Sequence, residues 1–192
     1  SLFVPDIDKP AYELQFRSSK EIGANAMALP DGTLIMTDEL VALAENDEEI
    51  LAVLAHELGH LNHRHSLRLL IEGSIVAFPV SAYLGDVSSI AAGLPTLLLQ
   101  TRYSREHESE ADFYAATMLR FNGISPTRLA DMLRKLEAAH RPQLATDKDE
   151  AGVENNSSSA EIFDYLSTHP ATQERIDALN GVQRSAEIRL EK

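Results

Sequence analysis

The sequence predicts an α+β domain that is mainly helical and has a small β-sheet near its N-terminus. Residues 11–18 alternate roughly between apolar and polar side chains, as a half-buried strand does. Residues 47–72 and 127–141 instead repeat apolar side chains at helical spacing. Because the chain has 192 residues, of which 44% are hydrophobic, we expect residues 1–192 to form one domain with a sizeable core.

The expected sheet is completed by two short stretches that a tight turn connects. Residues 23–29 and 33–37 flank Asp31 and Gly32, a pair of residues that suits such a turn. Residues 38–45 then have the pattern of a short helix.

The helix predicted over residues 47–72 has a clear start signal. Asn46 can cap it, and Glu49 stands three residues later as in a capping box. The acidic first turn suits the positive end of a helix. Five apolar residues then follow at helical spacing, namely Ile50, Leu51, Leu54, Leu58 and Leu61.

Within this helix, residues 56–60 read His-Glu-Leu-Gly-His, which places His56 and His60 one turn apart on the same face. Two neutral imidazoles in this arrangement can bind one zinc ion, which lowers the pKa of a bound water toward about 7. Glu57 lies at the edge of that face, where it can take a proton from water and pass it to a leaving amine. The motif therefore predicts a zinc hydrolase, and the alternative is two helical histidines that only line a core.

A catalytic zinc usually takes three protein ligands, so this motif needs a third. His63 lies near the same face, but ligands on one straight helix all approach the metal from one side. The longer signature with a glycine and a third histidine is absent, because His63 and Ser66 occupy those positions. His65 is expected on the opposite face, packed or hydrogen-bonded behind the site.

A second helix, predicted over residues 102–121, offers carboxylates as the missing ligand. Glu108 and Asp112 lie one turn apart on one face, and Ala111 and Ala115 let this helix approach another closely. Glu108 can ligate the metal, and Asp112 can accept a hydrogen bond from the outer nitrogen of a ligating histidine. Glu106 and Glu110 have the same spacing on another face, where a solvated acidic edge is the simpler interpretation, so spacing alone leaves the choice of glutamate open.

Residues 73–100 form an apolar interval in which Asp86 is the only charged residue. Two prolines and two glycines interrupt it, namely Pro79, Gly85, Gly93 and Pro95. The resulting pieces of about a dozen residues are shorter than the roughly 20 residues of a bilayer span. We therefore expect buried or surface-docked helices, with a hairpin that dips into one leaflet or a dimer contact as alternatives.

The C-terminal part is expected to contain two helices separated by a polar loop. Ser125-Pro126 starts the helix over residues 127–141. Residues 145–160 are acidic and rich in serine and asparagine, which predicts a mobile loop, either a lid or an ordinary insert.

These motifs together resemble the HtpX, BepA, Oma-type and CAAX prenyl protease family of zinc metallopeptidases, which belong to the gluzincin group. The resemblance rests on His-Glu-Leu-Gly-His followed by Arg-His-Ser at residues 64–66, and on Ser-Arg-Glu-His-Glu-Ser-Glu-Ala-Asp at residues 104–112. In that family Ser-Arg-x-x-Glu-x-x-Ala-Asp supplies a glutamate ligand and a supporting aspartate. The resemblance covers most of residues 20–180 and implies a zincin-like domain, with the sheet beside the active-site helix, in which Glu108 completes a site for one zinc ion and Asp112 supports it.

Two further stretches carry the same resemblance. Gly-Ala-Asn-Ala at residues 23–26 resembles the family's active-site edge strand, which implies that Asn25 and Ala26 bind an extended peptide substrate. The alternative for Asn25 is a turn or strand-end residue. Ser-Thr-His-Pro at residues 167–170 resembles a motif that borders the active site in the family.

His169 and Arg175 each have a functional and a structural interpretation. His169 precedes Pro170 and can orient the final helix, which begins around Ala171. The resemblance also implies a closed, self-inhibited state in which His169 covers the metal, as the corresponding histidine does in some members of the family. Either residue can help to hold the tetrahedral intermediate, and the structural alternative for Arg175 is an ion pair.

Charge and composition narrow the range of partners. The formal net charge of −13 argues against nucleic acid or an anionic membrane surface as a direct partner. The chain has no cysteine, so a metal must be held by histidines and carboxylates. It begins at Ser1 without a charged, apolar leader, so we expect the native chain to extend further, and membrane association through that segment or through residues 73–100 is an alternative. The sequence indicates no oligomeric state.

The sequence therefore predicts a zinc metalloendopeptidase. The family resemblance alone implies unfolded or misassembled membrane or envelope proteins as substrates, and the bacterial cell envelope as the location. One alternative is a zinc-bound chaperone or assembly factor that seldom cuts, although Glu57 argues against it. Another is a zinc hydrolase that acts on a substrate other than a peptide, for which the strand edge at Asn25 would have no purpose.

Overall fold

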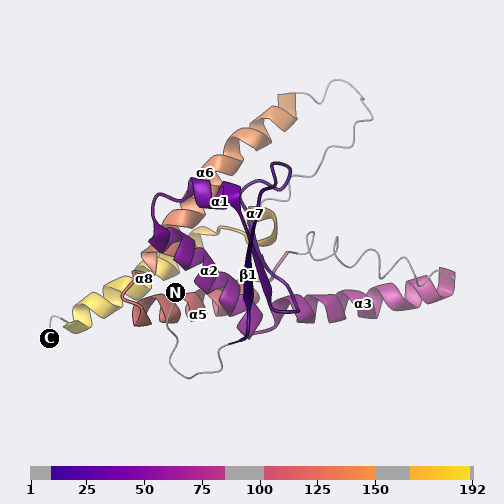
Figure 1. The fold of residues 1–192 in the computed structure, drawn as a ribbon, viewed down its shortest axis with the longest axis horizontal. Coiled ribbons are helices and arrows are strands. Elements are labelled where there is room, and N and C mark those ends of the chain that lie inside the picture. Colours follow the sequence, from indigo (N-terminus) through magenta and orange to yellow (C-terminus); the bar gives the residue numbers. More distant parts are fainter. Residues whose placement is uncertain (1–9, 85–101, 150–164, 191–192) are drawn as a thin grey trace.

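A computed structural model describes residues 10–84, 102–149 and 165–190 of the chain (Figure 1). It confirms a mainly helical α+β fold with one small sheet. The described elements, in chain order, are β1 (Glu13–Arg17), β2 (Ala26–Ala28), β3 (Thr33–Thr37), α1 (Asp38–Leu43), α2 (Asp47–Asn62), α3 (His65–Leu84), α5 (Arg105–Phe121), α6 (Thr127–Asp149), α7 (Tyr165–Thr168) and α8 (Gln173–Leu190).

The sheet has β3 at its centre, with β1 parallel to it on one side and β2 antiparallel to it on the other. The predicted turn at Asp31 and Gly32 joins β2 to β3. Gly32 has a φ of 94°, and a Cβ there would lie 2.9 Å from the carbonyl oxygen of Ala11, so both the conformation and the space require glycine. The order leaves β2 at the edge of the sheet that packs on α2.

The predicted cap of α2 is confirmed in a modified form. The side chain of Asn46 accepts a hydrogen bond from the backbone N–H of Glu49 at 3.1 Å. The Glu49 carboxylate reaches back to the backbone N–H of Glu45 at 2.8 Å, one residue earlier than in a standard capping box. Lys135 of α6 donates to the same carboxylate at 2.8 and 2.7 Å, so this cap also ties α2 to α6.

The prediction of one helix over residues 47–72 was wrong at a single point. The helix breaks after Asn62, because Arg64 has a φ of 56°, in the left-handed region. The apolar spacing continues through the break, so it carries no signal of it. The break turns the start of α3 toward the rest of the fold, where His65 and Ser66 are buried and the Ser66 hydroxyl donates to the carbonyl of Ala28.

The prediction that Pro79 interrupts the apolar interval was also wrong. α3 continues through Pro79 and ends at Leu84. Proline fits the φ of a helix, and the backbone hydrogen bond that it removes does not end this helix. Residues 85–101, with the other predicted breaks, lie outside the described residues. Among the described residues, no helix combines the length and apolar character that crossing a bilayer requires.

The polar loop expected over residues 145–160 begins later than predicted. α6 extends past Pro142 to Asp149, so residues 145–149 are helical. These five residues include no glycine or proline, and composition rich in polar side chains does not by itself end a helix. Residues 150–160 lie outside the described part of the chain, so the predicted lid is not tested there.

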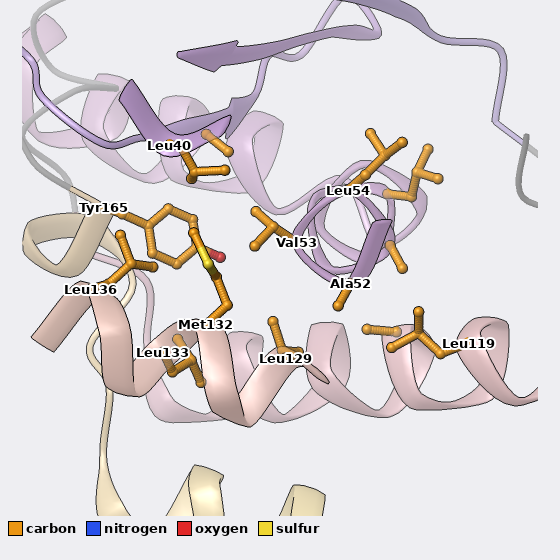
Figure 2. Close-up of a cluster of buried hydrophobic side chains, with 14 of the residues drawn as sticks. Leu40, Ala52, Val53, Leu54, Leu119, Leu129, Met132, Leu133, Leu136 and Tyr165 are labelled. Atoms are coloured by element: carbon orange, nitrogen blue, oxygen red, sulfur yellow. The ribbon is translucent and has the colours of Figure 1, made fainter. Parts of the chain in front are cut away.

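The apolar core lies around α2, between the sheet, α6 and α7. Figure 2 shows Val53 of α2 facing Leu40 of α1, Tyr165 of α7 and Met132 of α6, all fully buried. Helix α5 covers another side of α2. A Cβ at Gly59 would lie 2.9 Å from both the Cα and the carbonyl oxygen of Ala111, so the two helices meet backbone to backbone, as the small residues predicted.

Candidate metal centre

Helix α2 brings the three polar residues of its motif together in the interior. His56 and His60 are fully buried and Glu57 is 1% exposed. The Nε2 atoms of the two histidines lie 3.0 Å apart, so both imidazoles converge on one point, as their spacing predicted.

Helix α5 supplies the third group. Ser104 caps the helix, and Glu108 in its first turn is buried against α2. The carboxylate oxygens of Glu108 lie 3.5 Å from Nε2 of His56 and 3.4 Å from Nε2 of His60. Glu106 is exposed and Glu110 contacts His65, so the structure brings Glu108, and neither of the other candidates, to the two histidines.

His169, between α7 and α8, lies at the same point. Its Nδ1 is 3.0 Å from Oε1 of Glu108, and its Nε2 is 3.7 Å from Oε1 of Glu57. Its ring stacks on Tyr165 at a centroid distance of 4.4 Å. One ligand atom from each of His56, His60, Glu108 and His169 can be chosen so that all four lie within 4.8 Å of one another.

These donors suit a zinc ion, which binds imidazole nitrogen and carboxylate oxygen. Among the described residues, neither carboxylate oxygen of Glu57 has a hydrogen-bond partner, although the side chain is buried. A buried carboxylate without a hydrogen bond is costly, so this position favours a nearby cation and a water that donates to Glu57. The residues therefore fit the metal that the motif predicts.

Asp112 and Arg175 form a buried layer behind His56. Oδ1 of Asp112 lies 2.9 Å from Nδ1 of His56, which directs the Nε2 of that ring to the site. Arg175 donates to both oxygens of Asp112, from Nε at 2.7 Å and from Nη2 at 2.8 Å. Its Nη1 pairs with Glu108 and donates to the carbonyl of Pro170 at 2.9 Å. The guanidinium thus forms the ion pair that the sequence left open as its structural alternative.

The electrostatics of the centre follow from burial and close opposite charges. Burial opposes a charge on His56, but the hydrogen bonds to Asp112 and Glu108 outweigh it and raise the pKa of His56 to about 9. Burial alone would raise the pKa of Glu108, yet the neighbouring histidines hold it well below its usual range. Burial lowers the pKa of His60 well below its usual value. Without a metal, a proton on His56 is therefore favoured over a proton on His60.

The two residues of the predicted substrate edge lie at the start of β2. Ala26 is the first residue of β2 and Asn25 precedes it, and their backbone groups point in opposite directions. Both are buried. The backbone N–H of Asn25 donates to Oγ1 of Thr37, and its carbonyl accepts from the Thr37 N–H, so the backbone of Asn25 faces β3. Because backbone groups alternate along a strand, those of Ala26 face away from β3. On that outer side, the Ala24 carbonyl accepts from the N–H of Tyr165 at 3.3 Å.

Two tyrosines beside the centre were not identified from the sequence. Tyr103 lies with its ring centroid 4.0 Å from that of His60 and 4.8 Å from that of His169. Its hydroxyl contacts Ser66 at 2.9 Å. Tyr165 stands four residues before His169, a helical spacing that could have indicated their stacking. No comparable signal in the sequence points to Tyr103.

Two further histidines, His65 and His63, lie behind and beside the centre. His65 is buried with its Nδ1 3.0 Å from Nδ1 of His60, which confirms the prediction of a histidine behind the site. The break after α2, rather than the far face of a straight helix, puts it there. Burial lowers the pKa of His65 to about 4, so it is neutral. His63 lies 3.8 Å from Glu110 and does not join the centre.

The chain is similar to known metalloproteases along most of its length. A family model described as Peptidase family M48 matches residues 5–183. The chain is 31% identical to a protease HtpX homolog of Sulfurihydrogenibium sp., over 88% of the chain and 64% of that protein. It is 25% identical to mitochondrial metalloendopeptidase OMA1 of Saccharomyces cerevisiae, over 91% of the chain and 48% of that protein. It is 28% identical to the beta-barrel assembly-enhancing protease of Yersinia pestis, over 58% of the chain and 26% of that protein. The chain thus spans less than two thirds of each relative.

Proposed function

The chain belongs to peptidase family M48 and carries the metalloendopeptidase domain of that family, and we propose that His56, His60 and Glu108 hold one zinc ion in it. The observation that carries this proposal is the convergence of buried donors from two helices, with Nε2 of each histidine within 3.5 Å of a Glu108 oxygen. We take residues 1–192 to form one catalytic domain that hydrolyses peptide bonds.

When bound, zinc supplies a Lewis acid that polarises the scissile carbonyl. Glu57, buried beside the ligands, takes the proton of the attacking water and delivers it to the leaving amine. Asp112 keeps His56 in the orientation that directs Nε2 into the site, and Arg175 keeps Asp112 in place. We assign Arg175 to this positioning role, because contacts to Asp112, Glu108 and Pro170 engage its guanidinium.

We propose that His169 closes the centre. This is supported by its burial, with 1% of the residue exposed, and by its contacts with Glu108 and Glu57. Access for a peptide then requires the segment between α7 and α8 to shift. After such a shift, the same ring can donate a hydrogen bond to the developing oxyanion.

An extended polypeptide is the substrate that the strand edge fits. The outward backbone groups of Ala26 can pair with a peptide, a contact that depends on backbone shape more than on side chains. Such recognition suits unfolded or misassembled chains. The name of the Yersinia relative, which refers to β-barrel assembly, supports a role in protein quality control at the bacterial cell envelope. We propose that any membrane association involves residues 73–100, an apolar interval with one charged residue.

The competing function is a zinc-bound chaperone or assembly factor that grips unfolded chains without cutting them. Glu57 argues against it, because a gripping cleft has no need of a buried general base beside the metal ligands.

Replacing Glu57 by glutamine tests the proteolytic assignment. Cleavage of an unfolded protein should fall by about 10²–10⁴-fold at equal zinc content, because the amide cannot accept the proton. Zinc content should stay at one ion per chain, because Glu57 is not among the proposed ligands. Equal cleavage by Glu57→Gln and the unmodified protein would refute the peptidase mechanism and favour the chaperone.

A further inference from the structure

A chain of hydrogen-bonding groups runs from the proposed ligand His60 to the protein surface. Nδ1 of His60 lies 3.0 Å from Nδ1 of His65, and Nε2 of His65 lies 2.9 Å from Oε2 of Glu110. The His65 side chain is fully buried, while that of Glu110 is 40% exposed. The three residues come from α2, α3 and α5, so only the folded chain brings them together.

The number of protons on His60 and His65 fixes which atom donates in each of these hydrogen bonds. A neutral imidazole has one N–H and one lone pair. His60 directs Nε2 toward the other ligands, so a metal there takes that lone pair and leaves the proton on Nδ1. That N–H donates to Nδ1 of His65, whose own proton must then be on Nε2, where it donates to the Glu110 carboxylate. Each N–H in these two hydrogen bonds therefore has an acceptor.

We propose that His65 and Glu110 are positioning residues that hold His60 in the tautomer and orientation needed to bind the metal. They would do for His60 what Asp112 and Arg175 do for His56. The proposal rests on the proposed function, because it requires His60 to be a metal ligand.

A second metal ion is the alternative use of these groups. Ligand atoms of His63, His65 and Glu110 all lie within 4.8 Å of one another. An ion on Nε2 of His65 would remove the proton that donates to Glu110, while Nδ1 still accepts from His60, so His65 would have to become an anion. The rings of His63 and His65 are also stacked at an interplanar angle of 12°, and near-parallel rings do not direct their lone pairs at one ion. Both arguments favour the hydrogen-bonded chain.

Asp112 should affect metal binding through His56 more strongly than Glu110 affects it through His60. Asp112 is a charged partner in direct contact with its histidine and is largely buried. Glu110 acts through a neutral histidine and is partly exposed, so water screens its charge. Loss of His65 should therefore matter more than loss of the charge on Glu110.

Metal affinity, measured by competition with a chelator of known zinc affinity, tests the proposal in four variants. His65→Leu should weaken zinc binding by about 10–100-fold. His65→Asn, whose Oδ1 can stand in for Nδ1 as the acceptor, should recover part of that loss. Glu110→Gln keeps an acceptor oxygen and should weaken binding less than His65→Leu. Glu106→Gln, an exposed carboxylate on the same helix, is the matched control and should leave affinity unchanged.

Proton NMR of the zinc-loaded protein supplies a second readout that a structural role would not move. The hydrogen-bonded Nδ1–H of His60 should give a downfield resonance that is kept in His65→Asn and lost in His65→Leu. Retention of that resonance in His65→Leu would overturn the proposal.

Three other outcomes would also overturn it. These are unchanged zinc affinity in folded His65→Leu, an equal loss in His65→Asn and His65→Leu, and a stoichiometry of two ions per chain with the second lost in Glu110→Gln. A separate variant tests the proposed function itself. If His60 is not a metal ligand, His60→Asn will leave zinc binding intact although His65 is unchanged.

Discussion

The buried carboxylate of Asp112 fixes the orientation of the His56 ring. Oδ1 lies 2.9 Å from Nδ1 of His56, and the two hydrogen bonds from Arg175 fix the plane of the carboxylate. The paired charges hold the pKa of Asp112 below its usual value even though burial opposes it, so the group stays ionised. Its charge and its geometry therefore both act on the metal centre.

Asp112→Asn should weaken zinc binding by about 10–100-fold, because an amide removes the charge that makes His56 a good donor. Competition with a chelator measures the loss. Asp131→Asn serves as the control, because Asp131 pairs with Arg134 on the surface of α6. Equal affinities in the two variants would contradict the role of Asp112.

Zinc binding should release a proton from His56. The pKa of His56 in the metal-free protein is raised to about 9, with the hydrogen bonds to Asp112 and Glu108 outweighing burial. Below that pH the ion must displace the proton, so apparent affinity should rise about tenfold per pH unit between pH 6.5 and 8. Calorimetric titration in buffers of different ionisation enthalpy counts the protons released. A count near zero at pH 7 would show that His56 is already neutral.

At the scale of elements, the close contact of α2 and α5 sets the distance between the motif and Glu108. Gly59 lies between His56 and His60 of α2 in sequence, and Ala111 follows Glu108 by three residues on α5. A Cβ at Gly59 would lie 2.9 Å from backbone atoms of Ala111, which cannot move without moving the helix. The glycine therefore controls the metal site through helix separation.

Gly59→Ala should destabilise the protein by about 1–3 kcal/mol and weaken zinc binding, because it pushes α5 and Glu108 away from α2. Gly181→Ala on α8 is the matched control, since a Cβ there would meet no atom of the described residues within 4 Å and alanine favours a helix by up to about 1 kcal/mol. Urea unfolding and chelator competition measure the two effects. Similar changes in both glycine variants would contradict the close contact.

The cap of α2 should make stability depend on pH. Burial alone would raise the pKa of Glu49, but the hydrogen bonds from Lys135 and the backbone N–H of Glu45 outweigh it and lower the pKa. Stability from this carboxylate is thus present above the ordinary glutamate value of about 4.3 and is lost as the pH falls through the lower folded value. Glu49→Gln should cost about 1–3 kcal/mol at pH 7 and less below pH 4, as urea unfolding would show. A cost that does not change with pH would exclude this ion pair as its source.

At the scale of the whole molecule, the centre joins segments far apart in the chain. Its donors come from α2, from α5 and from His169 between α7 and α8. A metal held there by His56, His60 and Glu108 would link α2 to α5, and an unfolded chain offers no such site. Metal binding and folding are therefore coupled.

Removing the metal should lower the melting temperature, and adding zinc should restore it. At a free zinc concentration of 1,000 times Kd, binding adds about 4.1 kcal/mol to the stability of the folded state. Scanning calorimetry with and without a chelator measures the change. Glu57→Gln should keep the full shift and His60→Asn should lose most of it, whereas an equal shift in both would mean that the ion binds elsewhere.

Local patterns were enough to predict most elements and part of the site. The cap at Asn46, the turn at Gly32 and the face shared by His56 and His60 each depend on residues within a few positions of one another. The break at Arg64 was missed because apolar spacing does not depend on the backbone angle of one residue. The length of α6 was missed because composition does not determine where a helix ends.

The sequence by itself determined the class of this chain, a zinc metalloendopeptidase, because His56, Glu57 and His60 stand on one helix at the spacing of a zinc hydrolase motif. Only the tertiary structure decided which groups complete that chemistry. Glu108 and Glu110 have similar local signals, and the packing of α5 on α2 takes the first to His56 and His60 and the second to His65. His65 and His169 reach the centre through a left-handed residue and through the junction of α7 and α8. Those contacts join residues distant in sequence, so spacing cannot reveal them.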